Sequence, residues 1–152
     1  MDSSQVIDVN AALEQCGDDR DFLFELLHDL KVELTSQITK IGHEFEKNVS
    51  NEFFNLHFSN LKKNSIEHSS SLSLSQVHGV DVLRREESFV VIQRAAHVIK
   101  GAAANLMCEE LRVRATNVED AAKTGRGDLL HDLYQALNVA AVRFVEFVHS
   151  QS

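Results

Sequence analysis

The chain has 152 residues, of which 43% are hydrophobic and 25% charged, and its formal net charge is −8. This composition supplies enough apolar side chains for one core and excludes disorder throughout. The acidic balance argues against nucleic acid or an anionic membrane as partner, because both need a cationic surface. No apolar stretch approaches the roughly 20 residues that span a bilayer, and no signal sequence opens the chain, so we expect a soluble, cytoplasmic protein.

Proline is absent from the whole chain, which favours long helices joined by few connections. The first predicted element is a short helix over residues 9–16, with Asp8 as its N-cap and Gly17 as its stop. A longer helix follows over about residues 19–41, beginning at Asp18 or Asp19. Its leucines recur at helical spacing and form one apolar stripe: Leu23, Leu26, Leu27, Leu30 and Leu34.

Residues 42–88 give a weaker pattern than the helices on either side. Spaced Phe and Leu residues over 45–61 either continue the second helix past Gly42 or form a separate helix. A serine-rich run follows, and its low complexity predicts a mobile loop over about residues 64–76. We therefore interpret 42–88 as a partly helical insertion within a single domain that covers residues 1–152.

Three further helices are predicted over residues 87–106, 109–124 and 128–149. Gly125 ends the middle one, and Asp128 can cap the last. The apolar stripe of the last helix is expected to hold Leu129, Leu133, Leu137, Ala140, Phe144 and Phe147. Strand-like alternation is missing, and two of the three joints are short. The sequence therefore predicts an all-α fold: an antiparallel up-down-up-down four-helix bundle, with a short N-terminal capping helix and an insertion between the second and third helices.

His97 lies on the third long helix, on the side away from the predicted core. On a helical wheel the apolar residues cluster between about 140° and 220° from His97. These residues are Ile92, Ala95, Ile99, Ala102 and Leu106. The face around His97 carries small and polar residues instead: Gln93, Arg94, Lys100, Gly101 and Ala104.

Gly101 is unexpected on an exposed helix face, because a glycine inside a helix costs about 0.5–1 kcal/mol relative to alanine. One explanation is that another molecule must approach the helix closely beside His97. A neutral imidazole is a good nucleophile near pH 7, and the Lys100 ammonium one turn away can stabilise a transferring phosphoryl group. The alternative is that His97 is an ordinary solvated histidine.

Three stretches of the chain combine into a larger pattern. The first is Asp8-x-x-x-Ala12-Leu13-x-x-Cys16-Gly17-Asp18-Asp19. The second is Ala96-His97-x-x-Lys100-Gly101-Ala102-Ala103-Ala104-Asn105-Leu106. The third is Val118-Glu119-Asp120-Ala121-Ala122-x-x-Gly125, preceded by Leu111. Together they resemble the histidine-containing phosphotransfer (HPt) domain family, and the resemblance covers about residues 6–41 and 87–150.

The resemblance implies that His97 accepts a phosphoryl group from an aspartyl-phosphate on a receiver domain and passes it to a second receiver. The implied partners are receivers of hybrid histidine kinases and of response regulators. Lys100 would assist electrostatically. The docking surface would comprise Gln93, Arg94, Gly101 and Ala104. Such a domain is a phosphocarrier rather than a conventional enzyme, and it needs no cofactor or metal of its own because the receiver supplies Mg²⁺. We also expect a monomer.

The chain departs from the family pattern at two places. The family usually has glycine ten residues after the histidine, where this chain has Met107. We expect Met107 either to lengthen the helix by a turn or to change its packing. The segment 42–88 far exceeds the family's usual connection, and nothing in the motif explains it.

Two other functions compete with phosphotransfer. An HPt-like helical adaptor would bind receiver or kinase partners without carrying phosphate. A metal site is suggested by Glu25-x-x-His28, because this spacing occurs in di-iron bundles. Asp128-x-x-His131 has the same spacing with aspartate in place of glutamate. Helical wheels turn both pairs away from the core, so we expect no metal there. Cys108, at a helix end, is expected to pack rather than to act as a nucleophile.

Overall fold

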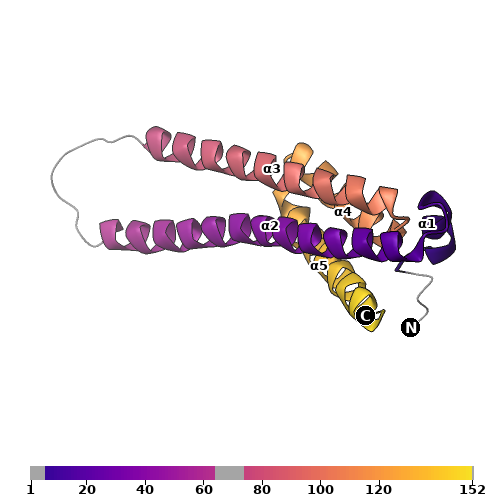
Figure 1. Cartoon of the computed structure of the whole chain (residues 1–152). Helices are drawn as coiled ribbons and strands as arrows, with labels where there is room; N and C mark the ends of the chain where they lie inside the picture. The colour runs from indigo at the N-terminus through magenta and orange to yellow at the C-terminus, as the bar shows by residue number, and fades with distance from the viewer. Residues whose placement is uncertain (1–5, 64–73, 152) are drawn as a thin grey trace.

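The computed structural model describes residues 6–63 and 74–151, with side chains described outside residues 49–84 (Figure 1). It contains the helices α1 (Val9–Gln15), α2 (Arg20–Lys63), α3 (Leu74–Asn105), α4 (Glu109–Lys123) and α5 (Gly127–Ser150). The prediction of an all-α fold is confirmed. None of the described helices is both long enough and apolar enough to cross a membrane.

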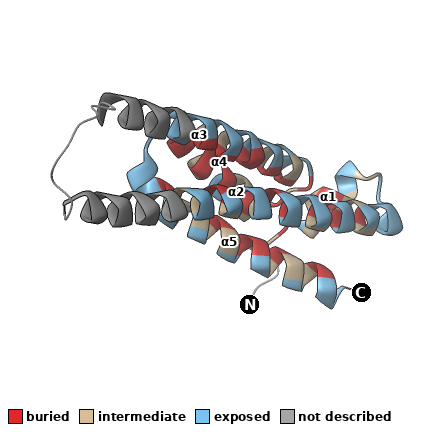
Figure 2. Ribbon diagram, turned by 90° about the vertical axis from the view of Figure 1, so that its left-hand side faces the viewer, coloured by how far each residue is buried: buried red, intermediate tan, exposed pale blue. Residues whose placement is uncertain are grey.

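The four longer helices form the predicted bundle. α3 packs against both α2 and α4, and α5 packs against the same two helices, so α2 and α4 are diagonal to each other. Figure 2 shows the buried positions gathered on the inward sides of these helices. The largest fully buried side chains include Leu23, Leu27, Leu34, Ile92, Ile99, Leu111, Leu137 and Phe144. The predicted leucine stripe of α2 is therefore confirmed, with Leu26 only partly buried at its edge.

The short helix α1 lies at one end of the bundle (Figure 1). The Asp8 side chain accepts a hydrogen bond from the Ala11 amide at 3.0 Å, which confirms the predicted N-cap. The Asp8 amide in turn donates to the Met107 carbonyl at 3.2 Å. Together with the buried Ile7 and Ala12, this bond fixes α1 at the turn between α3 and α4.

The second helix does not end near residue 41, since α2 continues to Lys63. Gly42 does not break it. A Cβ atom at Gly42 would lie 2.8 Å from the Tyr134 hydroxyl of α5, so this glycine permits close packing inside a continuous helix. Similarly, α3 begins at Leu74 rather than near 87. Much of the predicted insertion is thus helix that extends α2 and α3.

The predicted mobile loop over 64–76 falls mainly on residues 64–73, which lie outside the described residues. Its last three positions belong to the first turn of α3. Both helices that flank the loop are longer than α4 and α5, as Figure 1 shows. The two short joints predicted between the later helices are confirmed at residues 106–108 and 124–126.

Two predictions at the start of α5 are wrong. Arg126, not Asp128, is the N-cap residue, and Asp128 lies in the first turn, where its carboxylate is 3.2 Å from Arg126 Nε. Leu129 is 44% exposed, and Leu130 takes its place in the core, whereas the later residues Leu137, Ala140 and Phe144 of the predicted stripe are buried. The buried residues of α5 are Leu130, Leu137, Ala140, Ala141, Phe144 and Val148.

Met107 does not lengthen α3, which ends at Asn105. Met107 has φ 55°, the left-handed conformation that glycine usually supplies after a helix. The Cys108 amide donates to the Ala103 carbonyl at 2.9 Å and closes the turn. The half-buried Met107 side chain packs against the core, which offsets part of the roughly 1–2 kcal/mol that a non-glycine residue loses in this conformation.

Candidate functional site

The two faces of α3 have the environments predicted for them. Ile92, Ala95 and Ile99 are buried, whereas the His97 side chain is 67% exposed on the opposite face. The other predicted site residues surround His97: Arg94, Gly101 and Ala104 are exposed, and Gln93 and Lys100 are half-buried. A Cβ atom built on Gly101 would meet no described atom within 4 Å. The backbone beside His97 is therefore open to an approaching molecule.

Glu119 joins this site from α4, although the sequence analysis did not select it as a site residue. The Met107 turn folds α4 back along α3 and brings Glu119 opposite His97. Glu119 Oε1 lies 2.9 Å from His97 Nδ1, and Glu119 Oε2 lies 2.5 Å from Lys100 Nζ. Two side chains one turn apart on α3 thus converge on a single carboxylate.

The Glu119 carboxylate is ionised in this setting. Its side chain is only 11% exposed, and burial alone would raise its pKa. The ammonium of Lys100 and the hydrogen bond with His97 outweigh burial, so the pKa of Glu119 is lowered. An ionised carboxylate can only accept hydrogen bonds, and therefore His97 Nδ1 carries the hydrogen and donates it. In the neutral ring the lone pair is then on Nε2.

This arrangement suits His97 to act as a nucleophile at Nε2. The bond from Nδ1 to Glu119 fixes the tautomer and orients the ring. When Nε2 forms a new bond, the ring becomes cationic, and the adjacent carboxylate stabilises that charge. The Lys100 ammonium, on the next turn of α3, is the nearby cation for a negatively charged group held at Nε2.

A sequence signal for Glu119 was present on α4. Leu111 and Ala115, at eight and four residues before Glu119, are both buried, and so is the adjacent Val118. Glu119 therefore occupies the apolar stripe of its helix. A glutamate at such a position is almost always paired, because burying an uncompensated charge is costly. Searching for its partner would have led to the neighbouring helix.

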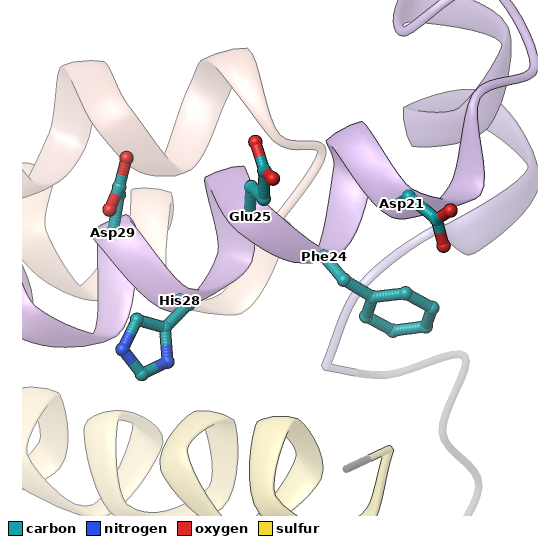
Figure 3. Close-up of a pocket in the computed structure, with 5 residues that line it drawn as sticks. All are labelled: Asp21, Phe24, Glu25, His28 and Asp29. Atoms are coloured by element: carbon teal, nitrogen blue, oxygen red, sulfur yellow. The ribbon is translucent and has the colours of Figure 1, made fainter.

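The competing chemistries find little support at the residues that suggested them. Glu25 and His28 are exposed, and Figure 3 shows their side chains pointing in different directions from α2. Asp128 and His131 are exposed as well, so the predicted outward orientation of both pairs is confirmed. Across the described ranges, no three His, Cys, Asp or Glu residues are grouped so that they could hold a metal ion. Burial raises the pKa of the Cys108 thiol to about 12, which keeps it protonated and unreactive.

Comparisons with models of protein families, with curated proteins and with solved structures find no match for this chain. The features of the chain that indicate a function are therefore the cluster of His97, Lys100 and Glu119 and the open helix face around it.

Proposed function

We propose that the protein is a phosphorelay intermediate. His97 accepts a phosphoryl group from the aspartyl-phosphate of one receiver domain and passes it to another. The observation that carries this proposal is the exposed imidazole whose Nδ1 is bound at 2.9 Å to the buried Glu119 carboxylate. A solvated surface histidine has no need of such a partner, whereas a nucleophilic imidazole gains both its tautomer and its orientation from it.

The phosphoryl transfer needs no cofactor bound to this chain. The lone pair of His97 Nε2 attacks phosphorus, the bond from phosphorus to the aspartyl oxygen breaks, and the receiver's aspartate leaves as a carboxylate. The hydrogen on Nδ1 stays in place, so the phosphorylated ring is cationic and lies against the Glu119 carboxylate. The reverse steps deliver the phosphoryl group to the aspartate of the second receiver.

The surroundings of His97 are consistent with a partner that approaches closely. In-line transfer requires the reacting atoms to come within about 3–3.5 Å of one another. Gly101 and Ala104 have small side chains or none, so a partner can approach the helix backbone there, and open space lies over Gly101. The proposed partners are receiver domains of hybrid histidine kinases and response regulators, which bring their own Mg²⁺, and the relay would operate in the cytoplasm.

The test is phosphate transfer from isolated receiver domains. A panel of receivers is labelled on aspartate with ³²P, purified and mixed with the protein. We expect label on the wild-type chain that is acid-labile and base-stable, the property of a phosphoramidate. The His97→Gln variant should take no label. Its melting temperature should stay close to that of wild type, because the glutamine amide can still donate a hydrogen bond to Glu119 at this exposed position.

His28→Gln is the matched control, since His28 is another exposed histidine in the bundle. It should accept label as wild type does. Binding of receivers without any labelling of the wild-type protein would instead favour the adaptor function. Label that persists in a folded His97→Gln variant would place the accepting group elsewhere.

A further inference from the structure

A cavity of about 590 Å³ lies at the start of α5, where α2 and α3 continue beyond α4 and α5 (Figure 1). This volume is typical of small-molecule sites in proteins. Residues of α2, α3 and α5 line the cavity, together with Gly125 of the turn that joins α4 to α5. One of them, Phe89, precedes His97 by eight residues, which is about 12 Å along the axis of α3. The cavity is therefore separate from the cluster around His97.

Two phenylalanine rings from different helices line this cavity, and both are held in place. The ring centroid of Phe45 lies 5.7 Å from that of His131 and 5.1 Å from that of Tyr134. Phe89 lies against Gly127, where a Cβ atom would be 3.2 Å from the phenylalanine ring. Because contacts between aromatic rings add to the gain from burial, these two walls favour an aromatic guest.

The cavity is apolar at depth and polar at its mouth. Ile92 and Leu130 line it and are each only 1% exposed. Arg85, Asp128 and His131 also line it but are exposed to solvent. A bound molecule can thus bury an apolar body while its polar group stays in contact with water, which avoids the cost of burying a charge.

The charges at the mouth favour an acidic group over a basic one. The Asp128 carboxylate is 3.2 Å from Arg126 Nε, so its negative charge is compensated. Arg85 already has an interaction within the chain, but a guanidinium has five N–H donors and can bind a carboxylate as well. The His131 ring can donate a further hydrogen bond beside it.

We infer that this cavity binds a small aromatic acid, with its ring system against Phe45 and Phe89 and its acidic group at Arg85. The inference does not rest on the proposed function, because none of these three residues takes part in phosphotransfer. The ligand contacts α2, α3 and the start of α5 together. It therefore stabilises the folded state, as any molecule does that binds the native protein alone.

The experiment compares two fluorescent dyes on the full chain. Anilinonaphthalene sulfonate combines an aromatic ring system with an anionic group, and phenylnaphthylamine is the same ring system without the sulfonate. We expect a single site on the wild-type protein, with a dissociation constant about tenfold lower for the sulfonate dye. Naphthylacetate, a carboxylate, should displace this dye, whereas naphthylmethylamine, a cation of similar size, should not.

The position of the acidic group is tested at two arginines. Arg85→Gln should weaken binding of the sulfonate dye about tenfold and leave binding of the neutral dye unchanged. Arg114→Gln is the matched control, because Arg114 is also exposed but lies on α4, outside the cavity. It should change neither affinity. Both variants should fold as wild type does, since both positions are on the surface.

The position of the ring system is tested at two half-buried phenylalanines. Phe89→Ala should weaken both dyes about tenfold, because each loses an aromatic wall. Phe147→Ala is the matched control, since Phe147 packs against the core near the other end of α5. It should bind both dyes as wild type does.

The outcomes separate the parts of the inference. Equal affinity for the two dyes, or equal losses in Arg85→Gln and Arg114→Gln, would overturn the assignment of an acid. Absence of dye binding, or unchanged binding in a folded Phe89→Ala variant, would overturn the cavity as the site. Losses confined to Arg85→Gln and Phe89→Ala support it. None of these results bears on phosphate transfer to His97, which is measured separately.

Discussion

Two buried carboxylates in this bundle have nearly the same surroundings and different consequences. Glu44 on α2 accepts a hydrogen bond from Ser88 Oγ on α3 at 2.8 Å and pairs with Lys47 at 2.8 Å. Glu119 on α4 contacts His97 and Lys100 on α3. The two glutamate side chains are 10% and 11% exposed, and both pKa values are lowered because hydrogen bonds and cations outweigh burial.

The difference lies in the group that each carboxylate holds on α3. Ser88 is buried, so the group that Glu44 holds on α3 is out of reach of solvent, and the bond between them joins α2 to α3. His97 is 67% exposed, so the Glu119 cluster presents a titratable ring to the solvent. A buried carboxylate is therefore a structural connector in one case and the support of a candidate nucleophile in the other. Its partner, rather than its own environment, separates the two roles.

The largest difference between the Glu44 and Glu119 clusters is expected when each glutamate is changed to glutamine. Glu119→Gln keeps an acceptor for Nδ1 but removes the charge that would stabilise a phosphorylated ring, so under the proposed function transfer to His97 should slow at least tenfold. Glu44→Gln should leave transfer unchanged and lower the free energy of unfolding by about 1 kcal/mol, because a charge-assisted hydrogen bond becomes a neutral one. Labelled transfer and urea unfolding of both variants test this pair. Equal transfer rates in the two variants would remove Glu119 from the mechanism.

The two lysines allow a smaller test of the same difference. Under the proposed function, Lys100→Ala should slow transfer several-fold without abolishing it, since Lys100 would contribute charge and would form no bond to phosphorus. Lys47→Ala removes the corresponding cation of the Glu44 cluster, where the lysine is 54% exposed, and should not change the transfer rate. Single-turnover transfer rates measured at saturating receiver are the readout. A Lys100→Ala rate equal to that of Lys47→Ala would show that the charge beside His97 is not used.

The sequence predicts the residues of these clusters that depend on one helix better than those that depend on contacts between helices. The leucines from Leu23 to Leu34 mark the inner face of α2 correctly, because many apolar residues share one helical period. His97 and Lys100 are found from their own helix for the same reason. Glu119 is marked on its own helix as a charge within the apolar stripe, but its pairing with His97 and Lys100 depends on the tertiary contact between α3 and α4. The sequence leaves open whether the second helix continues past Gly42, because Tyr134, whose hydroxyl lies against this glycine, is on a helix far along the chain; the structure shows that the helix continues.

Both carboxylates should contribute to sensitivity towards acid. A group whose pKa is lowered in the folded state stabilises the fold above its ordinary pKa, and that stabilisation is lost as the pH falls through the lowered value. The free energy of unfolding should therefore be constant near neutral pH and decline below about pH 4.5, the ordinary glutamate value. Glu44→Gln/Glu119→Gln should decline less steeply than wild type in urea titrations. A parallel decline would assign acid sensitivity to other carboxylates.

The smallest expected effect is at Met107, whose turn sets the register of α4 and so affects the Glu119 cluster but not the Glu44 cluster. Met107→Gly removes about 1–2 kcal/mol of left-handed strain at φ 55°. It also loses the packing of a half-buried side chain and gains freedom in the unfolded chain, each worth about 1 kcal/mol. The terms nearly cancel, so the free energy of unfolding should change by less than about 1 kcal/mol, and transfer should be normal.

Gly125→Ala is the control for this prediction. Gly125 has φ 69° with open space around it, so an alanine there introduces only backbone strain. It should lose about 1 kcal/mol. Slower transfer in a stable Met107→Gly variant would show that methionine at this turn holds Glu119 in register with His97.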